Sequence, residues 1–101
     1  MTTSFKYIAL VRKEDNTDYW VDIPDLPGCV SYGDTIDDAM ANFQEALDLH
    51  LESIRKSREP LPIPRSKEDV LGTEEEEWLQ AYWVQISNDD MLHTVFQQIS
   101  R

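Results

Sequence analysis

Residues 24–40, PDLPGCVSYGDTIDDAM, mark the point at which the sequence changes from strand-like to helical character. Pro24 and Pro27 lack the N–H groups that a strand ladder needs, and Gly28 permits a tight bend. From Thr35 onward the apolar residues recur at spacings of three and four, which is the period of one face of a helix. The stretch therefore predicts a corner of a sheet that leads directly into an amphipathic helix.

The predicted helix has clear start and stop signals. Thr35 is a favoured capping residue, acidic residues surround the first turn, and basic residues lie near the last. The segment 58–66, REPLPIPRS, ends the helix because its three prolines cannot continue it. The apolar stripe consists of Ile36, Ala39, Met40, Phe43, Ala46, Leu47, His50, Leu51 and Ile54.

Stretches rich in β-branched and aromatic residues predict the strands. FKYIALVRK (5–13) and YWVDIP (19–24) predict an antiparallel hairpin, and CVSYGD (29–34) predicts a third strand. WLQAYWVQIS (78–87) predicts a last strand that is apolar on both faces and must therefore be covered on both. NDDMLHTVFQQISR (88–101) places apolar residues at helical spacing and predicts a short C-terminal helix.

Together these elements predict an α+β fold. We expect a small antiparallel sheet of three to four strands with helices packed on it, in the order β-β-β-α-β-α. A chain of 101 residues has room for one main core, which we assign to residues 1–87. Residues 88–101 are too short and too weakly basic for a complete DNA-binding domain. The connector segment SKEDVLG (66–72) has room for one helical turn.

Composition limits the classes of function. The formal net charge of −11 disfavours unaided binding to nucleic acid and favours a basic partner. A single cysteine permits no intrachain disulfide, and the first residues lack the features of a signal peptide. We therefore expect a cytoplasmic protein, and no apolar run is long enough to span a membrane.

No motif for catalysis, a metal or another cofactor stands out, and we expect no enzyme activity. Cys29, His50 and His93 lack the spacing of zinc ligands, and Gly28 and Gly33 flank a strand instead of opening a phosphate-binding loop. We expect Cys29 to be a small buried residue and not a nucleophile.

Two features leave alternatives open. Asp22, Asp25, Asp34 and Asp38 lie on or near the predicted sheet, and convergence of these carboxylates would create a Mg²⁺ site of nuclease type. The tryptophans Trp20, Trp78 and Trp83 are costly to leave in water, and strand alternation sends some of them to the face opposite the first helix. Unless the C-terminal helix covers that face, it is an interface for self-association or for a partner.

The segments YIALVRKE, YWVDIPDLPGCVSYGDTIDDAMANFQEALDLHLESI and EPLPIP resemble the N-terminal domain of the HicB-type antitoxin family. The family pattern D-L-P-G-C-x-[ST]-x-G-[DE]-T is followed by a helix with an [ED]-A-x-x-N-x-x-E-A-L stripe. The resemblance covers residues 5–64. The matching positions are Asp25, Leu26, Pro27, Gly28, Cys29, Ser31, Gly33, Asp34, Thr35, Ala39, Asn42, Glu45, Ala46 and Leu47.

The resemblance implies a partial RNase-H-like fold that binds and silences a small basic toxin of the HicA type, an RNA-cleaving protein. An acidic antitoxin would dock on the toxin's RNA-binding surface and exclude the substrate. For the toxin contact we predict Trp20, Asp22, Asp25 and Tyr32, although Trp20 and Tyr32 fit equally well as core or homodimer residues. The competing hypotheses are an RNase-H-like metal nuclease and an orphan homo-oligomer without a toxin.

Overall fold

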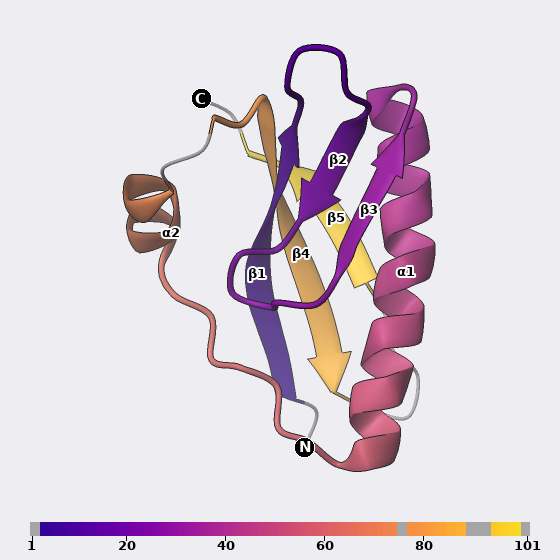
Figure 1. Ribbon diagram of the computed structural model, residues 1–101. Helices are drawn as coiled ribbons and strands as arrows, with labels where there is room; N and C mark the ends of the chain where they lie inside the picture. Colours follow the sequence, from indigo (N-terminus) through magenta and orange to yellow (C-terminus); the bar gives the residue numbers. More distant parts are fainter. Residues whose placement is uncertain (1–2, 75–76, 89–93, 100–101) are drawn as a thin grey trace.

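The computed structural model describes residues 3–74, 77–88 and 94–99. It contains one five-stranded antiparallel sheet in the order β3-β2-β1-β4-β5 (Figure 1). The predicted α+β class is confirmed, with five strands in place of three to four. In chain order the elements are β1 (Thr3–Arg12), β2 (Tyr19–Asp22), β3 (Val30–Gly33), α1 (Ile36–Ser57), α2 (Lys67–Thr73), β4 (Gln80–Asn88) and β5 (Thr94–Gln98).

The central strand β1 is buried on both faces. Tyr7, Ala9 and Val11 belong to the main core beneath α1, whereas Ile8 and Leu10 pack into a second cluster on the other face. This separation follows from the alternation of side chains along a strand. The helices α1 and α2 accordingly lie on opposite sides of the sheet (Figure 1).

The helix α1 forms as the sequence predicts. The hydroxyl of Thr35 accepts a hydrogen bond from the N–H of Asp38 at 3.0 Å, and Arg58 ends the helix in a left-handed conformation with φ 59°. Its fully buried side chains are Ala39, Phe43, Leu47 and Leu51, all members of the predicted stripe. Neither helix of the described chain is long and apolar enough to cross a membrane.

The prediction of a C-terminal helix over residues 88–101 was wrong in the part that the structure describes. Asn88 ends β4 and Thr94–Gln98 forms β5, while residues 89–93 and 100–101 lie outside the described chain. The predicted order β-β-β-α-β-α was therefore also wrong: the second helix, α2, precedes the last two strands, and the order is β-β-β-α-α-β-β. Helical spacing was a misleading signal: pairing with β4 satisfies the backbone of this β-branched and aromatic segment, and Phe96 and Ile99 pack on the two cores.

The connector after α1 covers the second face of β1 and β4. The SKEDVLG segment forms α2, with Ser66 as its cap, and Val70 packs with Leu10 and Ala81. Trp78 and Trp83 pack, partly buried, against the same cluster. The last predicted strand, β4, is thus covered on both faces, by α1 on one and by α2 on the other. The second face is covered by α2 and not by a C-terminal helix.

Gly33 lies where β3 approaches the first turn of α1. A Cβ atom at this position would be 2.3 Å from the backbone nitrogen of Ala39 and 2.7 Å from the carbonyl carbon of Asp38. We expect Gly33→Ala to lower the free energy of unfolding by about 2 kcal/mol, because backbone must shift to make room. Urea denaturation measures this change. Gly72→Ala is the matched control, since nothing lies within 4 Å of the added atom; equal losses in both variants would contradict the close approach.

Candidate protein-docking face

The half of the sheet formed by β2 and β3 has one covered face and one open face. Val21 is fully buried beneath α1, so its neighbour Trp20 points to the opposite face, where it lies across from Tyr32. On this face the exposed fractions are 57% for Tyr32 and 47% for Val30, and Trp20 is half-buried. We call Trp20, Val30 and Tyr32 the aromatic face.

A side chain of α1 partly blocks the free edge of β3. The amide Nδ2 of Asn42 donates a hydrogen bond to the backbone carbonyl of Tyr32 at 2.9 Å. This contact occupies an outward-pointing acceptor of the edge strand, and occupied edges resist pairing with another chain. One acceptor of this edge strand is therefore already occupied, whereas the side chains of the aromatic face are exposed or half-buried.

Asp22 shares the open face of β2 with Trp20, but its charge is compensated inside the protein. Arg12, which is 3% exposed, donates from Nε to Asp22 Oδ1 at 2.7 Å and contacts Glu74 Oε1 through Nη1 at 2.8 Å. Burial alone would lower the pKa of Arg12, but the hydrogen bonds and charges of Asp22 and Glu74 outweigh it and raise the pKa above its usual value. The predicted contact residue Asp22 thus helps to hold Arg12, and Arg12 in turn fastens Glu74, at the end of α2, to the sheet.

Asp25 lies in the turn between β2 and β3 and has a comparable internal partner. Its carboxylate accepts hydrogen bonds from the backbone N–H and from Nε of Arg65, both at 2.7 Å. Arg65 also donates to the hydroxyl of Thr73 at 3.0 Å. Of the four predicted contact residues, Trp20, Asp22 and Tyr32 therefore project from one face of the sheet, whereas Asp25 serves the adjoining turn.

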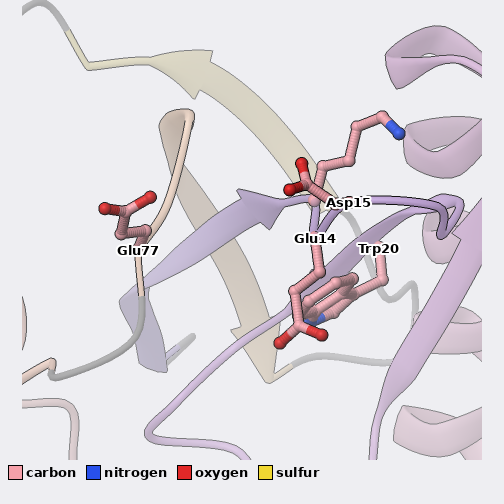
Figure 2. Close-up of a pocket in the computed structure, with 5 residues that line it drawn as sticks. Glu14, Asp15, Trp20 and Glu77 are labelled. Carbon is pink, nitrogen blue, oxygen red and sulfur yellow. The ribbon is translucent and has the colours of Figure 1, made fainter.

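A hollow of about 370 Å³ opens beside Trp20. In Figure 2, Glu14 and Asp15 reach it from the β1–β2 hairpin, and Glu77 approaches from the segment before β4. Sequence reasoning missed this site because Glu77 follows the end of the hairpin, at Asp22, by more than fifty positions, and no local pattern joins the two. Only the pairing of β1 with both β2 and β4 brings them together.

The carboxylates that motivated the nuclease alternative do not converge. Asp22 and Asp25 bind different arginines, and Asp38 lies in the first turn of α1. Across the described residues, no three histidine, cysteine, aspartate or glutamate side chains are arranged to hold a metal ion. His93, one of the residues considered as a ligand, lies outside this part of the chain.

Cys29 is buried, as the sequence predicts, and is 5% exposed. Burial raises the pKa of its thiol to about 11, so little thiolate forms near neutral pH. We expect native protein at pH 8 to react with a thiol reagent roughly 100-fold more slowly than a free cysteine. Labelling rates in buffer and in denaturing urea measure this difference, and equal rates would show that Cys29 is accessible in the folded state.

A small acidic α+β domain with an open aromatic face has the features of a protein-binding domain. The chain belongs to the HicB-like antitoxins of bacterial toxin–antitoxin systems, whose family model matches residues 7–99.

Two solved structures agree with this membership, and the chain is also similar to curated proteins. A UPF0150 protein of Thermoplasma acidophilum is 35% identical over 63 residues, which are 62% of this chain and 91% of the relative. The crystal structure of the N-terminal domain of the Burkholderia pseudomallei antitoxin HicB matches with a TM-score of 0.60 and 31% identity, over 84% of this chain and 99% of that domain. The crystal structure of the antitoxin itself matches with a TM-score of 0.59 and 34% identity; the match covers 85% of this chain and 64% of the antitoxin.

Proposed function

We propose that the chain is an antitoxin that binds a small basic RNA-cleaving toxin of the HicA type and masks the toxin's RNA-binding site. The observation that carries this proposal is membership in the HicB-like antitoxin family over residues 7–99. The net charge of −11 supports it, because a toxin that holds RNA presents a basic surface.

In this mechanism charge supplies attraction and the aromatic face supplies specificity. Acidic side chains raise the rate of encounter with a basic protein, but charge alone does not select one partner. Trp20 and Tyr32 contribute large side chains of the kind that dominate binding energy once a partner excludes water. Asp22 and Asp25 act mainly by fixing the strand and the turn that carry them, since each is held by an arginine of the same chain.

A pull-down of the tagged chain at about 0.15 M salt tests the proposal, because charge-steered complexes weaken as screening rises. We expect to recover a small basic protein that, once purified, cleaves RNA and stops cleaving when the chain is added. Recovery of the chain alone, together with failure to bind a small basic protein encoded beside it, would favour an orphan homo-oligomer and contradict the proposal.

A further inference from the structure

We propose that a partner covering the aromatic face inserts an arginine side chain into the hollow beside Trp20. The inference rests on the proposed function, because it takes the toxin as the partner. Trp20 belongs to both surfaces: it pairs with Tyr32 on the aromatic face and lines the hollow. A protein that covers the aromatic face therefore has a side chain within reach of the hollow.

The carboxylates around the hollow differ from Asp22 and Asp25, which are each paired with an arginine. Within the described residues, no ion pair engages the side chains of Glu14, Asp15 or Glu77, and all three residues are exposed. They come from two separate segments, the β1–β2 hairpin and the segment before β4 (Figure 2), and line the same hollow. Negative charge is therefore concentrated here, and none of the ion pairs among the described residues balances it.

The basic residue that lines the hollow does not supply that cation. The ammonium group of Lys13 donates a hydrogen bond to the backbone carbonyl of Thr17 at 2.8 Å and lies 5.3 Å from the centre of the Tyr19 ring. Tyr19 packs against the main core on the α1 side of the sheet. The charge of Lys13 is thus turned away from Trp20 and the open face.

Arginine fits this combination better than other side chains. Its planar guanidinium group stacks on an indole ring while its N–H groups bind carboxylates on either side, and it tolerates loss of water better than an ammonium group. A hollow of about 370 Å³ is at the small end of the range for binding sites and suits one long side chain. Once the partner excludes water, the charge contacts strengthen.

The test compares two variants of the full chain that each lose three negative charges. Glu14→Gln/Asp15→Asn/Glu77→Gln alters the hollow, and Glu45→Gln/Asp48→Asn/Glu59→Gln alters exposed positions on and just after α1. Toxin affinity is measured by titration calorimetry at two salt concentrations. We expect about a 30-fold loss and a weaker salt dependence for the hollow variant, and a loss below threefold for the control.

A double-mutant cycle identifies the occupant. Each arginine of the toxin is changed to methionine and measured against wild type and the hollow variant, and we expect one arginine whose loss costs little once the hollow is neutralised. If wild type binds no toxin, the proposed function itself fails. If wild type binds and the two charge variants bind alike, or if no arginine couples to the hollow, the inference is overturned while the proposed function stands. A hollow variant that changes only the self-association of the free chain would also overturn it, because a second copy would then be the occupant.

Discussion

The double variant Trp20→Ala/Tyr32→Ala is expected to bind the toxin about 100-fold more weakly than the wild type, a loss of about 3 kcal/mol. The two side chains lie opposite each other on neighbouring strands, and 57% of Tyr32 is exposed in the free chain. A toxin that covers them removes two large aromatic surfaces from water. Buried aromatic side chains of this kind supply most of the binding energy in protein interfaces.

The control for this experiment is Leu49→Ala/Ile63→Ala, which removes two large apolar side chains that are 64% and 84% exposed elsewhere on the molecule. We expect the control to bind within threefold of wild type. Tyr32→Ala alone provides a variant that disturbs packing little, and circular dichroism checks the fold of each. Wild-type affinity in the aromatic double variant would show that the toxin contacts another surface.

Phe43→Ala is expected to lower the free energy of unfolding by about 3–5 kcal/mol. Phe43 is fully buried in α1, and its ring meets that of Phe96 edge to face at a centroid distance of 6.4 Å. The residue therefore joins α1 to the edge strand β5 across the main core. Because domains of this size have a total stability of about 5–15 kcal/mol, the variant loses a large share of it.

Urea denaturation followed by tryptophan fluorescence measures this loss. Gln44→Ala, at the adjacent exposed position of the same helix, is the control and is expected to change stability by less than about 0.5 kcal/mol. A loss below about 1 kcal/mol for Phe43→Ala would contradict the packing of α1 against β5.

The elements that sequence reasoning predicted correctly are those that depend on near neighbours. The cap at Thr35, the buried stripe of α1 and the bend at Gly28, where φ is 95°, each follow from residues within a few positions. The requirement that β4 be covered on both faces was also predictable, because its own side chains demand it.

The features that were missed depend on contacts between distant parts of the chain. Phe96 and Ile99 fit a helical period, but an unpaired edge of β4 and two apolar clusters favour a strand there. In the same way, nothing near Asp22 in the sequence indicates that it shares Arg12 with Glu74. Nothing near Trp20 indicates that Glu77 lines the same hollow. Of the predicted contact residues, the orientation of Trp20 and Tyr32 follows from alternation, whereas the internal pairing of both aspartates does not.

The most direct test of the central claim is RNA cleavage by the purified toxin, measured while the chain is titrated in and the bound fraction of toxin is followed in the same samples. Masking of the RNA-binding site predicts that cleavage falls in proportion to the toxin bound and that excess RNA competes with the chain. A toxin that is fully bound and still cleaves RNA at its original rate would contradict the claim.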